Sequence, residues 1–212
     1  MTALALVFGD APVDKYGIEW TTVPGAAVDG LLAEHHYLGP LASGGALTIA
    51  GLRDGEVVAA QIWKHPTSRR LPFGGSWLEL ARWCLTPAAG EYAGSRMHRQ
   101  AVPLLRRAFP TATTLVSYSD PAQGHDGTLY RACNWWWRPT WMRLRPPPSG
   151  GGAWVPGVPQ AVKDRWVFPL RPDAAREQVT RIDDPAAIRY WREHHTVNEA
   201  KWARSHPQLA LL

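Results

Sequence analysis

A hairpin signal near residue 54 places the strongest constraint on the fold. Residues 46–52 and 57–63 are two runs of strand-forming residues, and the short segment between them contains Asp54-Gly55. Asp-Gly readily adopts the left-handed backbone of a two-residue hairpin turn, so the runs are predicted to pair as antiparallel strands. Residues 77–85 alternate in polarity and predict a further strand. The sheet is therefore expected to begin with three antiparallel strands.

Helix and strand patterns alternate after residue 85. Residues 95–109 place apolar side chains near a 3.6-residue repeat with arginines on the other side, which predicts an amphipathic helix. A β-branched strand over 113–118, a short helix over 127–134 and a strand over 135–144 follow. This order predicts an α+β fold with a mixed, mostly antiparallel central sheet flanked by helices.

The N-terminal part of the chain shows less pattern. Residues 1–24 are predicted to be irregular, whereas residues 26–38 have a helical pattern that ends at Gly39-Pro40. We expect this short helix to precede the first strand of the hairpin.

The C-terminal part begins with a segment that cannot pack. Residues 146–152 read Pro-Pro-Pro-Ser-Gly-Gly-Gly, a composition typical of a loop. A strand over 165–170 and a helix over 185–203 are predicted beyond it. We therefore divide the chain into a domain over 1–145 and a C-terminal strand and helix extension over 146–212 that packs on the same domain.

The composition is that of a globular protein. Of the 212 residues, 45% are hydrophobic and 19% are charged, which excludes a disordered or collagen-like chain. No apolar run approaches the roughly 20 residues of a membrane-spanning helix. Cys84 and Cys133 lack C-x-x-C spacing, which argues against a disulfide scaffold or a cysteine-based zinc site. We expect a cytoplasmic protein without a membrane partner.

The positive charge is concentrated in one part of the chain. The net charge is +5, and the segment between Asp126 and Asp164 carries five basic residues and no acidic one. Three consecutive tryptophans, 135–137, lie within this basic segment, and alternation along a strand places the middle one on the opposite face from the other two. One of these faces is expected to be core. Arginine and exposed aromatic rings favour nucleic-acid binding, and the residues expected to contact DNA are Arg69, Arg70, Trp136, Arg138 and Arg143.

The segment over 116–130 is the most specific motif. It reads Val-Ser-Tyr-Ser-Asp-Pro-Ala-Gln-Gly-His-Asp-Gly-Thr-Leu-Tyr, which crowds polar groups between the end of a strand and the start of a helix. Asp126 and Thr128 are equally well explained as capping residues of that helix. For Asp120 and Tyr130 we favour a function, because open sheet ends and helix starts commonly build sites.

This motif resembles the phage Mom family of DNA-modification proteins. Three further stretches are similar to that family in the same order: His36-Tyr37, the segment over 79–82, and Ser95-Arg96. The order of elements over about residues 30–145 also resembles the GNAT acyltransferase superfamily. The resemblance implies a GNAT-like catalytic domain that adds a carbamoylmethyl group to the N6 amine of adenine in DNA, protecting the DNA from restriction.

The resemblance also implies roles for individual residues. Tyr130 is the expected general acid, and Asp120 is the expected base or orienting group, although the opposite assignment stays open. The other predicted site residues are Ser117, Ser119, His36 and Tyr37. Iron is a further implied cofactor, and His36, Asp120 and His125 would offer suitable N and O ligands, although no metal-spaced motif accompanies them. A duplex substrate would have to present a flipped adenine.

The group donor is less well defined than the acceptor. GNAT enzymes usually hold the pyrophosphate of coenzyme A with a glycine-rich loop. The corresponding stretch here places Glu91 where phosphates would lie, so an acyl-CoA or related donor is only one option. The candidate cofactor-binding residues are Arg82, Gly94, Ser95 and Arg96. A GNAT N-acyltransferase for a small amine or protein and a non-catalytic DNA-binding protein remain alternatives, and the oligomeric state, a dimer included, stays open.

Overall fold

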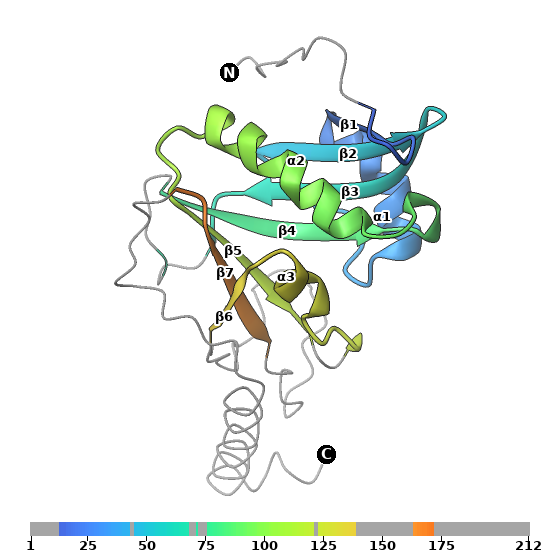
Figure 1. The fold of residues 1–212 in the computed structure, drawn as a ribbon. Coiled ribbons are helices and arrows are strands. Elements are labelled where there is room, and N and C mark those ends of the chain that lie inside the picture. The colour runs from blue at the N-terminus through green and yellow to red at the C-terminus, as the bar shows by residue number, and fades with distance from the viewer. Residues whose placement is uncertain are drawn as a thin grey trace, which may run out of the picture.

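A computed structural model describes residues 13–42, 45–67, 71, 76–120, 123–138 and 163–171. Seven strands and three α-helices make up this part of the chain (Figure 1). The strands are β1 (Glu19–Thr22), β2 (Leu47–Arg53), β3 (Glu56–Lys64), β4 (Trp77–Leu85), β5 (Thr114–Ser119), β6 (Trp136–Arg138) and β7 (Asp164–Pro169). The helices are α1 (Asp29–His35), α2 (Ala93–Ala108) and α3 (Thr128–Ala132), with short 3-10 helices at Gly25–Val28 and Pro87–Ala89.

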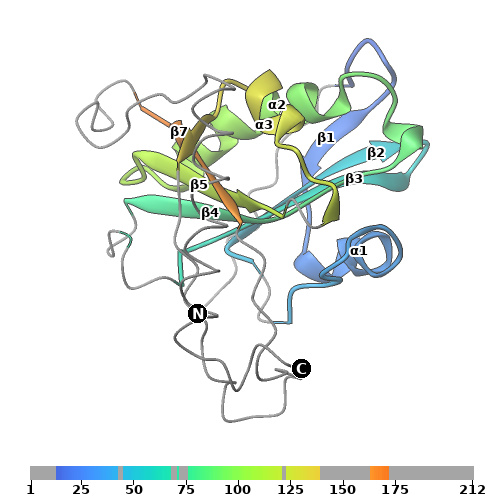
Figure 2. The same cartoon turned by 90° about the horizontal axis from the view of Figure 1, so that it is seen from below.

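The strands form one mixed sheet in the order β1-β2-β3-β4-β5-β7-β6. All neighbours are antiparallel except β4 and β5, which are parallel. Helices α2 and α3 lie on one face of the sheet and α1 on the other (Figure 2). The predicted α+β class and mostly antiparallel sheet are confirmed.

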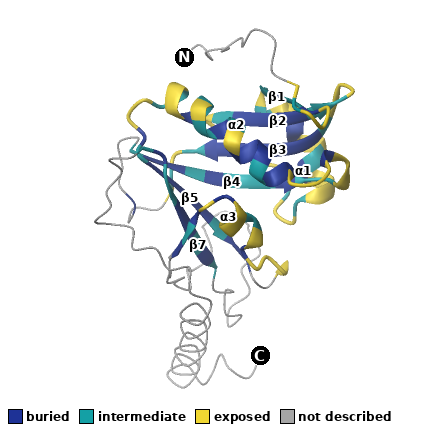
Figure 3. Cartoon of the chain, viewed as in Figure 1, coloured by how far each residue is buried: buried dark blue, intermediate teal, exposed yellow. Residues whose placement is uncertain are grey.

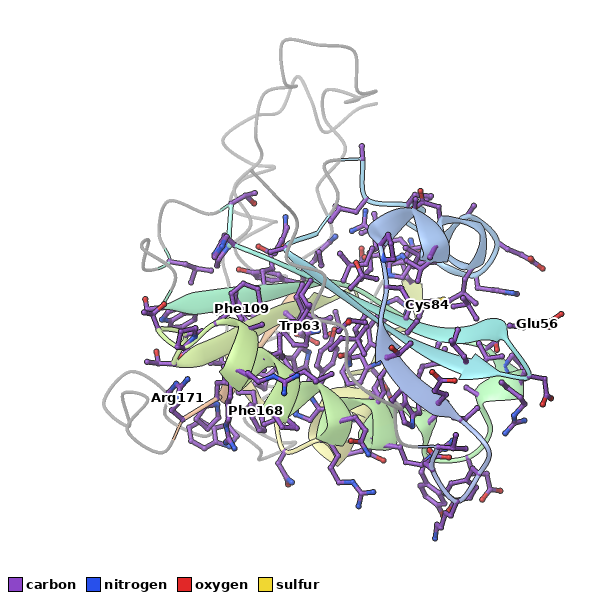
Figure 4. The ribbon with its side chains drawn as sticks, turned by 90° about the horizontal axis from the view of Figure 1, so that it is seen from above. Glu56, Trp63, Cys84, Phe109, Phe168 and Arg171 are labelled. Carbon is purple, nitrogen blue, oxygen red and sulfur yellow. The ribbon has the colours of Figure 1, made fainter. Side chains whose placement is uncertain are left out.

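The β2–β3 hairpin forms where Asp54-Gly55 predicts it. Both residues have positive φ, 53° and 82°, and Arg53 pairs with Glu56 across the turn. These are the dihedrals that a two-residue hairpin turn with the right-handed strand twist requires. Glu56 lies at the outer tip of the hairpin in Figure 4.

The expectation of irregular structure over 1–24 is wrong for residues 19–22, which form β1. This strand pairs antiparallel with β2, and Trp20 lies opposite Gly51. A side chain at Gly51 would collide with the Trp20 ring, so the glycine makes room for the indole. Four residues are too few to show an alternating pattern, and the pairing depends on a partner about 30 residues further along the chain.

The parallel strands β4 and β5 separate before either strand ends. Residues 77–80 pair with residues 114–117, after which β4 continues to Leu85 and β5 to Ser119 without pairing to each other. Figure 1 shows β5 and β7 turning away from β4, with α3 beside the divergence. The polar motif therefore lies where the sheet opens.

The main core fills the layer between the sheet and helices α2 and α3. Trp63, Trp137 and Trp166 are its largest fully buried side chains, and Trp63 and Phe168 are labelled in this layer in Figure 4. Figure 3 shows the buried residues concentrated along the central strands and the inner side of α2. A smaller cluster, which includes Leu32 and Cys84, packs beneath α1. Both cysteines are free.

Residues 164–169, which follow the predicted loop, contribute to the interior of the sheet. β7 covers almost the whole strand predicted over 165–170, and it lies between β5 and β6. The predicted helix over 185–203 and the residues of the predicted strand beyond 138 lie outside the described residues. Within the described residues, no helix is long and apolar enough to cross a membrane.

Candidate active site

The phenol of Tyr130 lies at the divergence of β4 and β5. Its hydroxyl is 2.8 Å from the Ser117 hydroxyl, and Ser117 Oγ donates a hydrogen bond of 3.0 Å to the Leu80 carbonyl of β4. A serine hydroxyl has one proton to donate, so Tyr130 must be the donor to Ser117. A chain of two hydroxyl groups thus connects α3 to β5 and β4 at the last pair of residues before these strands part.

Aromatic rings enclose the phenol. Tyr130 stacks on Trp166 with ring centroids 5.2 Å apart, and it makes edge contacts with Trp83 and Trp135. Burial among these rings raises the pKa of Tyr130 to about 12, against the lowering effect of the Ser117 hydrogen bond. Tyr37 adds to the rise. Tyr130 therefore holds its proton at neutral pH, as a general acid must.

Two local features place α3 against the sheet. Asp126 accepts hydrogen bonds from the Thr128 amide at 2.8 Å and from its hydroxyl at 2.6 Å, which also lowers the pKa of Asp126. The Asx-type turn at this pair is thereby confirmed, whereas the N-cap position of α3 is Gly127 and no side chain caps the helix. Gly127 has φ of 82° and lies so close to the Trp166 ring that a Cβ at this position would overlap the indole. The absence of a side chain therefore allows the start of α3 to pack against Trp166.

Gly127→Ala is expected to destabilise the protein and displace Tyr130. Gly124→Ala is the matched control, since Gly124 has φ of 75° but nothing within 4 Å of its hypothetical Cβ. Both variants carry the cost of a left-handed alanine, roughly 1 kcal/mol. Gly127→Ala should lower the free energy of unfolding by a further 1–3 kcal/mol or so, the usual cost of overpacking. Urea denaturation measures the difference, and equal losses in the two variants would contradict this account.

Asp120 follows directly after β5 and is largely buried. Its main-chain carbonyl accepts hydrogen bonds from the amides of Gln123 and His125, which turns the chain back toward α3. Its carboxylate lies 3.8 Å from the ammonium group of Lys163. Ser119, the residue before it, accepts a hydrogen bond of 2.9 Å from the Trp166 indole. The end of β5 is thus held by residues of β7 and of the segment that precedes it.

His36 and Tyr37 reach this region from the turn after α1. Their rings stack at 5.2 Å, and His125 makes an edge contact with Tyr37 at 5.3 Å. Arg82 of β4 holds the turn by donating a hydrogen bond of 2.7 Å to the Gly39 carbonyl. Burial lowers the pKa of His36 to about 4, and the positive charges of Arg82, His125 and Lys163 contribute. His36 is therefore neutral at physiological pH.

The iron expectation is not supported. His36 and His125 both approach Tyr37, and His36 Nδ1 accepts a hydrogen bond of 3.2 Å from the Leu38 amide. The residues that the structure describes contain no group of three or more His, Cys, Asp or Glu side chains that could hold a metal ion. With Asp120 paired to Lys163, these three side chains do not form a metal centre, and no step is assigned to iron.

Two of the predicted cofactor residues have protein partners instead of an open phosphate site. The Arg96 guanidinium is buried, pairs with the Asp14 carboxylate and donates a hydrogen bond of 2.5 Å to the Ala89 carbonyl. Arg82 is bonded to the turn after α1. Neither partner could be foreseen, because Asp14 and Gly39 lie 82 and 43 residues away in sequence.

The other two cofactor candidates lie in the first turn of α2. The Ser95 hydroxyl donates a hydrogen bond of 3.0 Å to the Tyr92 carbonyl. Gly94 allows α2 to approach α3, because a Cβ at this position would overlap Leu129. This contact packs the beginning of α2 against the helix that carries Tyr130.

The predicted DNA contacts lie mostly outside the described residues. These are Arg69, Arg70, Arg143 and the side chain of Arg138. Trp136 is partly buried and packs in a small cluster with Trp77, Val116 and Val167. Trp135 and Trp137 belong to the main core on the opposite face, so the predicted alternation is confirmed.

Sequence reasoning missed two contributors to the site, Lys163 and Trp166. In the sequence, Lys163 is recognisable only as one of five basic residues in an acid-free segment, and Trp166 only as an apolar residue of a predicted strand. Their positions follow from the pairing of β7 with β5, which aligns Asp164 with Ser119. The sequence of the strand predicted over 165–170 does not indicate which other strand it pairs with.

The chain is similar in fold to solved acyltransferases. A protein from Klebsiella pneumoniae assigned as an acyl-CoA N-acyltransferase has a TM-score of 0.50 at 16% identity, covering 74% of this chain and 100% of its own. The ribosomal-protein-S18-alanine N-acetyltransferase from Escherichia coli has a TM-score of 0.48 at 12% identity, covering 77% and 99%. A GNAT family acetyltransferase from Elizabethkingia anophelis, solved with acetyl-CoA bound, has a TM-score of 0.45 at 15% identity, covering 71% and 97%. The first of these likenesses shows the shared fold.

The sequence itself matches one protein family. No curated protein is significantly similar to the chain. The model of the Mom protein family matches residues 18–144, which include β1 to β6 and both the Tyr130 and the His36 sides of the site. Since this match spans well over half of the sequence, the chain belongs to the Mom protein family.

Proposed function

We propose that this protein is a transferase that adds a carbamoylmethyl group to the N6 amine of adenine in DNA. Membership of the Mom family supports this function. The observation that carries the chemistry is the protonated Tyr130 phenol, bonded to Ser117 where β4 and β5 part. Asp120, the residue after β5, supplies a carboxylate on the same strand extension as Ser117.

The two groups suit the needs of transfer to an adenine amine. The N6 lone pair is delocalised into the ring, so attack requires an acceptor for the amine proton and a donor for the leaving group. In the proposed step, N6 forms a bond to the donor carbon while the bond from that carbon to the leaving group breaks. Asp120 receives the amine proton, and Tyr130 gives its proton to the leaving group.

Ser117 has a defined part in this step. After proton transfer the Tyr130 oxygen carries a negative charge in a largely apolar setting, which is costly without a hydrogen-bond donor. The Ser117 hydroxyl, which donates to Leu80 in the resting arrangement, can rotate its proton toward the phenolate. The hydrogen bond to Ser117 is the one influence that lowers the pKa of Tyr130.

We further propose that the carbamoylmethyl group is carried on the sulfur of coenzyme A or a related thiol, so that N6 attacks its methylene carbon and the thiolate leaves. An acyl thioester would instead place an acyl group on N6. The Elizabethkingia protein of related fold binds acetyl-CoA. A thiolate is a leaving group that a neutral tyrosine can protonate. Arg82 and Arg96 are bound to protein groups, so their guanidinium groups would not be the main contacts of the donor. The donor would instead be bound chiefly by main-chain amides in the first turn of α2.

Nucleoside analysis tests the function. The chain is expressed in cells, total DNA is digested to nucleosides, and mass spectrometry is expected to find a carbamoylmethyl adduct of deoxyadenosine. An Asp120→Asn variant is the control and should give unmodified adenine. Unmodified DNA from the wild-type protein, together with acetyl-CoA-dependent acetylation of a small amine or protein, would contradict the proposal and favour an ordinary N-acyltransferase. DNA binding without either product would favour a non-catalytic protein.

A further inference from the structure

The cross-strand partner of Asp120 comes from beyond the part of the chain that matches the Mom family. β7 runs antiparallel to β5 with Ser119 aligned to Asp164, so the next pair outward is Asp120 and Lys163. The register thus sets Lys163 against the carboxylate, while the family match ends at residue 144. Trp166 of the same strand stacks on Tyr130 and donates to Ser119.

Lys163 contacts two of the predicted site residues together. Its ammonium nitrogen is 3.8 Å from an Asp120 carboxylate oxygen and 3.5 Å from the Tyr37 hydroxyl, and it lies 5.7 Å from the centroid of the Tyr37 ring. A lysine ammonium has three protons to donate, so it can serve both oxygens. It therefore links the end of β5 to the turn after α1.

The surroundings of Lys163 suit positioning better than phosphate binding. The side chains of Lys163 and Asp120 are 25% and 10% exposed, so most of the pair is withdrawn from solvent. A cation that binds the DNA backbone needs an open face toward the phosphates. Charge attraction is also less screened in a partly buried pair than on the surface, which favours one fixed arrangement.

We propose that Lys163 is a positioning residue of the active site, whose ammonium group holds the Asp120 carboxylate and the Tyr37 hydroxyl in the arrangement that receives the adenine amine. This proposal rests on the proposed function. It makes the strand β7 and the residue before it part of the catalytic centre and assigns Lys163 to Asp120 instead of to DNA phosphates.

The kinetic test uses Lys163→Met, Lys163→Arg and a matched control. Lys64→Met is that control, because Lys64 forms an ion pair with Glu79 at 3.2 Å and similar exposure, 21% and 13%. Adduct formation on duplex DNA is measured against DNA concentration, and thermal unfolding checks that each variant is folded. If Lys163→Met does not fold, Lys163→Gln replaces it.

The expected result is a change in kcat without a change in KM. Lys163→Met should lower kcat at least about tenfold, because a catalytic group misplaced by about 1 Å can cost up to about 10²-fold in rate, and it should leave KM for DNA within twofold. Lys163→Arg should restore most of kcat, and Lys64→Met should match the wild type. A raised KM with a shallower salt dependence and unchanged kcat would show a phosphate contact and overturn the proposal, as would an unchanged kcat and KM.

A second readout is independent of catalysis. Burial lowers the pKa of His36 to about 4, and the charge of Lys163 contributes to a smaller extent, so Lys163→Met should raise that pKa slightly and Lys64→Met should leave it unchanged. Histidine NMR titration of the free protein measures this, with His36→Gln assigning the signal. If the wild-type protein makes no adduct, the proposed function fails. If it does make the adduct but Lys163→Met leaves kcat unchanged, only the role of Lys163 fails.

Discussion

Tyr130→Phe is expected to abolish DNA modification while the protein keeps its fold and its affinity for DNA. The phenylalanine ring can keep the stacking on Trp166 and the edge contacts with Trp83 and Trp135. What disappears is the proton held next to Ser117. Loss of a general acid typically lowers a rate about 10²- to 10⁴-fold, so adduct formation should fall by that factor.

Two companion variants make this result specific. Ser117→Ala removes the donor that would stabilise the phenolate and should lower the rate by about tenfold or more, the loss expected for a hydrogen bond to a charged group. Tyr92→Phe removes a phenol whose side chain is 72% exposed, and it should leave the rate unchanged. Rates are measured as adduct formed per unit time on one duplex. A Tyr130→Phe protein that modifies DNA within threefold of the wild type would remove Tyr130 from the mechanism.

The second large effect is a loss of stability in mild acid that depends on His98. This residue is 5% exposed in the middle of α2, enclosed by the rings of Trp83, Trp135 and Phe168. Among the residues that the structure describes, neither of its ring nitrogens has a hydrogen-bond partner. Burial lowers the pKa of His98 to about 4, so the folded protein holds it as a neutral imidazole.

The direction of the pH effect follows from proton binding. The unfolded chain takes up a proton on His98 near the ordinary pKa of 6.5, whereas the folded protein takes it up only near pH 4. Between these values the unfolded state binds more protons, so the free energy of unfolding falls as the pH falls. The part due to His98 is fully present above pH 6.5 and amounts to about 3 kcal/mol, at 1.36 kcal/mol per pH unit.

His98→Phe should weaken this dependence and raise stability at neutral pH. The substitution removes two buried nitrogens without partners, each of which costs roughly 1–3 kcal/mol, and puts a ring of similar shape among the aromatic side chains. Urea denaturation at pH 7, 6 and 5 measures both effects, with His35→Gln on α1 as a control that removes an exposed histidine. A residual slope is expected from His36, whose pKa is also about 4. The same slope in His98→Phe and in the wild type would contradict the argument.

Local pattern was enough to predict most of the elements. The strand predicted over 77–85 is β4 residue for residue, and the predicted helix over 95–109 differs from α2 by two residues or fewer at each end. Strand alternation, helical periodicity and the Asp-Gly turn all depend on residues within a few positions of one another, so they can be read along the chain. The pairing of Ser117 with Tyr130 also comes from one short motif, whose strand, turn and helix leave these residues only 13 positions apart.

Tertiary structure alone decided the features that join distant segments. The placement of β7 between β5 and β6 brings Lys163 to Asp120. The fold also pairs the Arg96 guanidinium with the Asp14 carboxylate. The edge strand β1 likewise exists only through its pairing with β2. The order of residues determined the strands, the helices and the polar motif, because their signals are local. Which side chains meet across the divergence of β4 and β5 depends on strand register and on burial, and these are properties of the folded sheet.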